Sequence, residues 1–274
     1  MKRENYFRNL VTKPDEQINL AEAALHIASD QYPDLKIDSY LALLAGWGKE
    51  VSKKCARRIA RKRLDQINEF LFSDLKFSGN IENYYDPKNS FLNEVIDRRC
   101  GIPITLSVIY LEMAWRSQLN AAGVSFPGHF LVRVLIDQDL LYIDPFHQGN
   151  IMDASECREF WEDISGDEME FQEAFLSPTS RKQIVVRMLR NLKRIYLESK
   201  DYERLLPVLE KLIALNPDSA DEIRDRGIVY YHMEAFKLAM QDFETFLSVT
   251  PEGEDAEVIQ QYLEVLREYS SHLN

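Results

Sequence analysis

The chain has 274 residues, of which 45% are apolar and 28% are charged, as expected of a globular protein that buries one large core or two modest ones. Its 45 acidic and 33 basic residues give a formal net charge of −12, which opposes attraction to phosphate backbones and to anionic lipid surfaces. Nucleic acids and membranes are therefore not expected partners.

The first part of the chain, from about Pro14 to Phe72, has apolar residues at helical spacing. Pro33 lies between two such runs and predicts a connection between two helices. In the second run, apolar residues continue at four-residue spacing over 51–59, so the basic residues of 53–63 are interpreted as the solvated side of one amphipathic helix. A docking surface for an acidic partner is the alternative interpretation of this basic stretch.

A central buried helix is predicted to begin near Pro103, because proline suits the first turn of a helix. Residues 104–114 are apolar on most sides of that helix, as expected at the centre of a domain. Turn residues and a short apolar run over 91–96 come before it. The sequence thus predicts a buried helix that follows a helical lead-in.

After this helix the periodicity changes from helical to alternating. Bulky and β-branched residues dominate 130–136, and 140–143 continues the pattern across the polar residues 137–139, which predicts a β-hairpin. His129 opens the first strand and Asp144 closes the second, so antiparallel pairing places both side chains at the same end of the sheet. A buried helix followed by a small sheet indicates an α+β core.

The segment Ser177–Ser180 is the strongest candidate for a domain boundary, because it combines turn residues after a less periodic, acidic stretch. The sequence therefore predicts two domains. The first, 1–178, contains the helical lead-in and the α+β core, and the second, 179–274, is helical.

The C-terminal region contains an internal repeat. Apolar residues of 189–217 superpose on those of 223–251 with a single shift of 34 residues, which is the tetratricopeptide period. The second copy has Gly227 where its first helix needs a small residue for close packing, whereas the first copy has Lys193 there. Residues 256–272 are predicted to form a capping helix over the last repeat.

Five segments carry the most specific features of the chain: Tyr85–Leu92, Arg99–Ser107, Phe126–Phe130, Ile143–Phe146 and Ile223–Ile228. They resemble the SirB invasion-regulator family, bacterial proteins in which a transglutaminase-like core is followed by tetratricopeptide repeats. The resemblance covers nearly the whole chain. It implies a mostly helical α+β fold related to papain-like thiol enzymes, with a small antiparallel sheet, and no established reaction.

Cys100, His129 and Asp144 follow one another in the order thiol, imidazole and carboxylate that papain-like folds use. A thiolate needs a neighbouring imidazole to lower its pKa, and a carboxylate fixes the tautomer of that imidazole. These three residues are therefore the candidate catalytic set. The transglutaminase-like nucleophile, however, normally sits in the first turn of the central helix, nearer Thr105, so each of the three also has a structural interpretation as a turn, strand-start or capping residue.

Arginines supply the other candidate binding residues. Arg133 lies on the same face of its predicted strand as His129, where it can bind a substrate carboxylate or pair with an acid of the domain. A basic group in the first repeat helix can line a groove that receives an acidic tail, or can be a solvated helix face. This group comprises Arg187, Arg190, Lys193 and Arg194.

No metal, cofactor or disulfide is predicted. His129, Asp144 and His147 are residue types that ligate zinc, but no His-x-x-x-His spacing supports a site. The three cysteines are odd in number and widely spaced, which argues against a disulfide framework. Because no apolar run resembles a signal peptide or a membrane span, the sequence predicts a cytoplasmic protein with reduced thiols.

The leading functional hypothesis is a cytosolic interaction or regulatory protein, in which a non-catalytic transglutaminase-like core is joined to repeats that bind a protein or peptide. The alternative is a thiol-dependent amide hydrolase or acyl transferase, in which Cys100 attacks a carboxamide, His129 carries the proton and Asp144 orients His129. A regulator of gene expression that acts through a protein partner is a third hypothesis. The enzyme hypothesis requires the Cys100 sulfur to lie within hydrogen-bond reach of a His129 nitrogen, with some loosening of that contact when no substrate is bound.

Overall fold

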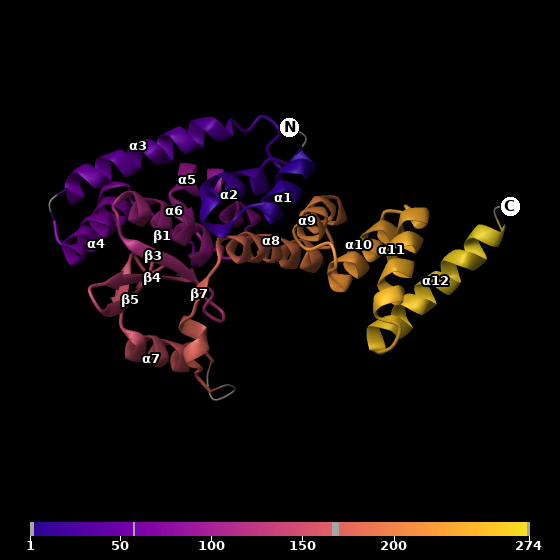
Figure 1. The fold of residues 1–274 in the computed structure, drawn as a ribbon. Helices are drawn as coiled ribbons and strands as arrows, with labels where there is room; N and C mark the ends of the chain where they lie inside the picture. The colour runs from indigo at the N-terminus through magenta and orange to yellow at the C-terminus, as the bar shows by residue number, and fades with distance from the viewer. Residues whose placement is uncertain (1–2, 57, 166–169, 273–274) are drawn as a thin grey trace. The chain divides into compact units, whose positions relative to one another are not determined.

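The computed structural model describes residues 3–56, 58–165 and 170–272 (Figure 1). The chain divides into two compact units. The core unit is Pro14–Met188, and the repeat unit combines Met1–Lys13 with Leu189–Asn274. Within the described ranges, no helix has both the length and the apolarity that a membrane crossing requires.

The core unit begins with helices, as the spacing of its apolar residues predicts. Asn19 caps the first α-helix of this unit, since its Oδ1 accepts a hydrogen bond from the Glu22 N–H at 3.1 Å. Pro33 lies in the connection between two of the helices. The helical elements of this region are η1 (Asp15–Gln17), α2 (Leu20–Ala28), α3 (Ile37–Cys55), α4 (Ala60–Asn68) and η2 (Glu69–Asp74).

The prediction of one continuous helix over 51–59 is wrong. The chain leaves the helical conformation at Ala56, where ψ is 133°, and α3 and α4 are separate helices. Ile59, expected on the buried stripe, is 72% exposed. Arg63 stabilises the turn, because its Nε donates a hydrogen bond to the Arg58 carbonyl at 2.9 Å. The apolar stripe therefore ends one turn earlier than its spacing indicates.

The predicted central helix is confirmed as α6, Pro103–Arg116, in which every residue as far as Ala114 is buried. It lies in the middle of the core unit (Figure 1) and packs against both α3 and the β-sheet. Thr105 closes its first turn, because Thr105 Oγ1 accepts a hydrogen bond from the Ile102 N–H at 3.2 Å and donates one to the Asn89 carbonyl at 2.8 Å. The start of α6 is thus tied by a buried hydroxyl to the segment before it.

One five-stranded antiparallel sheet lies beside α6. Its strands are β3 (Asn120–Val124), β4 (Leu131–Ile136), β5 (Asp139–Asp144), β6 (Asn150–Met152) and β7 (Pro178–Thr179). Their order in space is β6-β5-β4-β3-β7. The predicted hairpin is confirmed, since β4 and β5 pair with Val132 opposite Ile143, and their turn begins at Asp137 with a φ of 55°. Helix α7 (Ala154–Ser165) packs on β5 and β6, which completes an α+β fold.

A short parallel strand pair comes directly before α6 and sets Ser78 opposite Cys100. The loop within this region is fixed by Asn89, whose buried Nδ2 donates to the Asn83 carbonyl at 2.7 Å and whose Oδ1 accepts from Arg98 at 2.7 Å. Cys100 is thereby placed on a strand rather than in the helix. The elements are β1 (Ser78–Gly79), η3 (Pro87–Ser90), α5 (Leu92–Arg98) and β2 (Cys100–Gly101).

The C-terminal helices confirm the predicted tetratricopeptide repeats. A Cβ at Gly227 would lie 2.7 Å from the Phe243 ring, so the close packing of two helices requires glycine there. Lys193, which replaces the glycine in the first copy, instead forms 2.5 Å ion pairs with Glu222 and Asp225. The helices are α8 (Arg181–Glu198), α9 (Tyr202–Leu215), α10 (Ala220–His232), α11 (Phe236–Val249) and α12 (Glu254–His272).

The division between the two units falls within α8, between Met188 and Leu189. The first helix of the chain, α1 (Arg3–Thr12), belongs to the repeat unit, where it packs against α9. Sequence patterns did not indicate this assignment. The domains 1–178 and 179–274 stay predictions, because compactness does not show which segments fold independently.

Candidate functional site

The ends of two neighbouring strands bring His129 and Asp144 together. His129 precedes β4 and Asp144 ends β5, and the antiparallel pairing of these strands places both residues at one end of the sheet. His129 Nε2 and Asp144 Oδ2 are hydrogen-bonded at 2.8 Å. Only 8% of His129 and 1% of Asp144 are exposed, so the pair is shielded from water.

Asp144 accepts hydrogen bonds at both carboxylate oxygens. Its Oδ2 accepts from His129 and also from His147 Nδ1, at 2.7 Å, while its Oδ1 accepts from the N–H groups of Phe146 at 2.9 Å and His147 at 3.2 Å. Burial raises the pKa of Asp144, but hydrogen bonding and charge from His129, and then from His147, lower it by more, so its net pKa is below the ordinary value. Asp144 is therefore the ionised centre of a His–Asp–His cluster formed by His129, Asp144 and His147.

Aromatic rings surround this cluster. The His129 ring centroid lies 5.3 Å from that of Phe160 and 5.9 Å from that of Phe146, both edge-on, and the ring stacks on His147 at 5.7 Å. The His147 side chain is 48% exposed, so the cluster meets solvent through that residue. Among the described residues, His129 Nδ1 has no hydrogen-bond partner. The free edge of the imidazole is therefore available to another group.

Arg187 holds the backbone that carries His129. One of its terminal nitrogens donates to the Phe126 carbonyl at 3.0 Å and to the His129 carbonyl at 2.6 Å. The guanidinium also lies over the Phe130 ring, 5.5 Å from its centroid. Burial lowers the pKa of Arg187, which the nearby Tyr84 partly opposes. Arg187 is thus a positioning residue for His129, a role that its place in the predicted basic lining did not suggest.

Cys100 lies on β2, half-buried, and its thiol makes no hydrogen bond with His129 or with any other residue that the structure describes. The neighbouring strand β1 reaches the cluster through Gly79, since a Cβ there would lie 2.6 Å from the Phe146 ring. Cys100 therefore belongs to the same region of the core unit without a hydrogen bond to the imidazole. The helix position nearer to a transglutaminase-like nucleophile holds Thr105, whose hydroxyl is buried and already bonded.

Comparison with known proteins shows what the chain is similar to. Residues 38–190 match the family described as the transglutaminase-like superfamily, and residues 192–264 match the tetratricopeptide repeat. A UPF0162 protein of Xylella fastidiosa (strain Temecula1) is 35% identical over 261 residues, which cover 94% of this chain and 93% of that protein. The chain belongs to the UPF0162 family. Its core is transglutaminase-like, as the sequence resemblance implies.

Two further relatives of this UPF0162 chain are also similar to it. A UPF0162 protein of Vibrio cholerae is 25% identical over 260 residues, covering 94% of this chain and 96% of that protein. The mouse F-box only protein 21 is 32% identical over 182 residues, which cover 62% of this chain but only 28% of that protein. No solved structure matches the UPF0162 chain.

The remaining predicted binding residues of the UPF0162 chain lie outside the cluster. Arg133 is half-buried on β4 opposite Tyr142 and makes no hydrogen bond or ion pair within the described ranges. Arg190 lies 3.7 Å from Glu222, and Arg194 donates to Glu198 at 2.8 Å. These two arginines of α8 are therefore paired with acids of the repeat unit itself.

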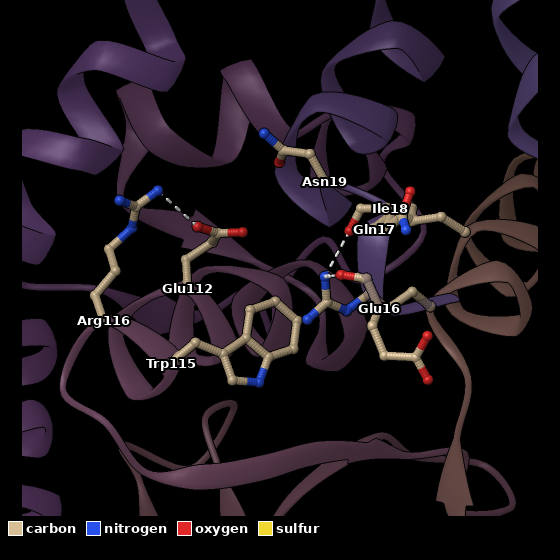
Figure 2. A pocket seen from close by; sticks show the side chains of 8 residues that line it. Glu16, Gln17, Ile18, Asn19, Glu112, Trp115 and Arg116 are labelled. Carbon is tan, nitrogen blue, oxygen red and sulfur yellow. Dashed lines mark hydrogen bonds and ion pairs between the residues drawn. The ribbon is translucent and has the colours of Figure 1, made fainter. Parts of the chain in front are cut away.

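A separate recess of about 370 Å³ lies in the core unit of this UPF0162 protein. Arg181 donates to the Ile18 carbonyl at 2.6 Å, and its guanidinium covers the Trp115 ring at 4.1 Å. Figure 2 shows Glu112 joined to Arg116, at a distance of 3.0 Å. Cys100, His129 and Asp144 do not line this recess. Glu112 and Arg116 are paired with each other, and Arg181 and Trp115 donate to backbone carbonyls, so these side chains of the recess indicate no particular ligand.

Sequence reasoning on this UPF0162 chain did not find the second hydrogen bond to Asp144. His147 was considered only as a metal ligand, although its place three residues after Asp144, across Pro145, lets a tight turn bring its ring back to the carboxylate. Arg187 reaches His129 from 58 residues away in the chain, and local patterns carry no trace of such a contact. The spacing of Asp144 and His147 is enough to predict the first contact, whereas no local pattern predicts the contact of Arg187 with His129.

Proposed function

We propose that this UPF0162 protein is a cytosolic interaction or regulatory protein of the SirB type, in which the transglutaminase-like core is not catalytic and the repeats bind a protein or peptide partner. The observation that carries the proposal is that the Cys100 thiol has no hydrogen bond to His129. A thiol enzyme needs an imidazole within hydrogen-bond reach to take up the thiol proton. Here both histidine rings are hydrogen-bonded to Asp144, whereas the Cys100 thiol has no hydrogen bond to either ring in the described part of the chain.

The repeats and a region shared with a longer protein support the part of the proposal that concerns partner binding. Tetratricopeptide repeats stack helix pairs into surfaces that suit peptide binding, and residues 192–264 match such repeats. The region shared with the mouse F-box only protein 21 makes up 28% of that longer protein. A region that recurs within a longer protein is expected of a module used for interaction.

The test is whether His129 affects the ionisation of the Cys100 thiol. Cys100 is alkylated with iodoacetamide at a range of pH values in wild type and in His129→Gln, and the extent of alkylation is measured by mass spectrometry. Because the thiol and imidazole are not hydrogen-bonded, we expect the pH profile of Cys100 alkylation to be the same in both proteins. Burial raises the pKa of Cys157 to about 12 and also raises that of Cys55, so these two thiols should stay unmodified in the folded protein and serve as internal controls.

A shift of the Cys100 profile to higher pH on loss of His129 would contradict the proposal. It would instead support the alternative function, a thiol-dependent amide hydrolase or acyl transferase that uses Cys100, His129 and Asp144. One observation favours that alternative: Asp144 holds His129 by Nε2 and leaves Nδ1 without a partner in the described part of the chain. An imidazole oriented in this way is ready to take a proton at Nδ1.

The partner is expected to be acidic where it meets α8. The side chains of Arg190 and Arg194 are 64% and 67% exposed. The Arg194–Glu198 pair is of the surface kind that contributes about 0–1 kcal/mol, and the buried Glu222 beside Arg190 also pairs with Lys193, so an acidic segment can compete for both arginines. A fluorescent oligoglutamate peptide should bind the wild-type protein at low salt, and binding measured by anisotropy should fall in the Arg190→Glu, Arg194→Glu double variant.

Arg204→Glu is the matched control for this measurement. Arg204 is also an exposed arginine of the repeat unit, 53% exposed and paired with Asp201, but it lies on α9. Equal losses in this control and in the double variant would indicate general charge attraction, and an unchanged affinity in the double variant would remove α8 as the binding surface.

A further inference from the structure

We propose that His129, Asp144 and His147 form a binding site for a divalent transition metal ion of the zinc type. Each residue offers one ligand atom, and these three atoms all lie within 4.8 Å of one another. His129 Nε2 and His147 Nδ1 both face the same oxygen, Asp144 Oδ2, at 2.8 and 2.7 Å. Two imidazole nitrogens and one carboxylate oxygen are the donor set of catalytic-type zinc sites, which keep a fourth position open.

The distances suit a metal after a small adjustment. Zinc bonds of 2.0–2.2 Å in tetrahedral geometry separate neighbouring ligand atoms by about 3.3 Å. The two nitrogen–oxygen separations must therefore open by about half an ångström, and the two nitrogens, which lie within 4.8 Å of each other, must come to the same separation of about 3.3 Å. Rotation of the exposed His147 ring opens its separation from Asp144, and a small shift of the buried His129 ring opens the other.

Two of the three ligands are fixed before any metal arrives. The Asp144 carboxylate is anchored at Oδ1 by the N–H groups of Phe146 and His147, and the His129 backbone is held by Arg187. Contacts of this kind orient metal ligands and support their affinity. His147, the third ligand, is 48% exposed and provides the entry path for an ion from solvent.

Charge and tautomers are also compatible with a cation. Asp144 is the ionised centre of the cluster, so a divalent ion bound by one carboxylate and two neutral imidazoles leaves a net charge of only +1. Ligation requires the imidazole protons to sit on His129 Nδ1 and His147 Nε2. Neither nitrogen has a hydrogen-bond partner among the described residues, so both can carry the proton, and the metal replaces the two hydrogen bonds that the rings make to Asp144 Oδ2.

The site adds to the proposed function without depending on it. A metal on His129 Nε2 takes the place of the hydrogen bond by which Asp144 would orient a catalytic imidazole. Metal binding and a working Cys–His–Asp set are therefore alternative uses of the same histidine. The peptide-binding surface of α8 is separate in sequence, so zinc binding and peptide binding are measured independently.

The test is calorimetric titration of Zn²⁺ into tag-free, chelator-treated protein, with the bound metal counted by elemental analysis after gel filtration. We expect one Zn²⁺ per wild-type chain. His147→Ala should weaken binding by about tenfold or more, which is at least the effect of disturbing the support of a metal ligand. Asp144→Asn should abolish binding, because it removes the charged ligand. His232→Gln is the matched control, since His232 stacks on Tyr202 in the repeat unit and should bind no metal of this site.

The His147→Ala variant decides the outcome, because an exposed side chain can be removed without unfolding the core, as circular dichroism will check. The proposal is overturned by a wild-type protein that binds no Zn²⁺, by a His147→Ala variant with wild-type affinity, or by a His232→Gln variant that loses as much affinity as His147→Ala. None of these results bears on Cys100 alkylation or peptide binding, so the proposed function stands or falls separately.

Discussion

Replacing Asp144 with alanine is expected to lower the free energy of unfolding by about 3–5 kcal/mol, the cost of breaking a buried charged network by removing one partner. The side chain is 1% exposed and accepts from two histidine rings and two backbone N–H groups. In Asp144→Ala the His129 ring and the Phe146 N–H stay buried without their acceptor. Because β5 ends at this residue, the loss also loosens the turn that carries His147.

The effect should depend on pH in a defined direction. The pKa of Asp144 in the folded protein is below its ordinary value of 3.8, so its stabilisation is present above that value and is lost as the pH falls through the lower, folded-state pKa. The stability difference between wild type and Asp144→Ala should therefore be constant near neutral pH and shrink in acid below about pH 4.

Urea unfolding followed by tryptophan fluorescence, at several pH values between 7 and 3, measures both effects. Asp139→Ala is the matched control, because Asp139 begins the same strand but is exposed, and its replacement should change stability by no more than about 0.5 kcal/mol. A loss at Asp144 of the same small size would show that the hydrogen bonds around this carboxylate do not stabilise the fold.

The parts of the fold that sequence predicted are those whose cause is local. Pro103 and the apolar residues after it specify α6, because a helix buried on all sides needs no polar face. The alternation around Asp137 specifies the hairpin and its end, and hence the meeting of His129 with Asp144. Gly227 marks the close helix contact that makes the repeat recognisable. In each case, neighbouring residues carry enough information to fix the geometry.

The wrong predictions have causes that the spacing of apolar and charged residues does not reveal. The stripe through Ile59 has perfect helical spacing, yet the helix stops at Ala56 because a turn held by Arg63 competes with helix continuation. Arg187 lies among basic residues that look like one solvated face, and only the folded chain reveals that its partner is the backbone of His129. Cys100 has the right order for a catalytic thiol, but order alone does not set a distance.

Replacing Gly149 with alanine is expected to destabilise the core unit by about 2–4 kcal/mol, from an overpacked contact added to backbone strain. Gly149 has a φ of 76°, and a Cβ there would lie 2.6 Å from both Asn68 Oδ1 and the Phe72 ring. Asn68 cannot move away freely, because its Oδ1 accepts from the Tyr110 hydroxyl and its Nδ2 donates to the Gly149 carbonyl, each at 2.8 Å.

Gly128→Ala separates the two causes, because Gly128 has a similar φ of 70° but its added Cβ would meet nothing closer than 3.9 Å. The free energy of unfolding of Gly128→Ala should fall only by the cost of the backbone strain, about 1 kcal/mol. In urea unfolding, the excess loss in Gly149→Ala then measures the contact with Asn68. Truncation of Asn68 to alanine in the same chain should recover part of that excess, since neighbouring changes are not additive. Equal losses of stability in Gly149→Ala and Gly128→Ala would show that the Asn68 side chain moves away from the added Cβ. Asn68 would then not fix the turn that carries His147.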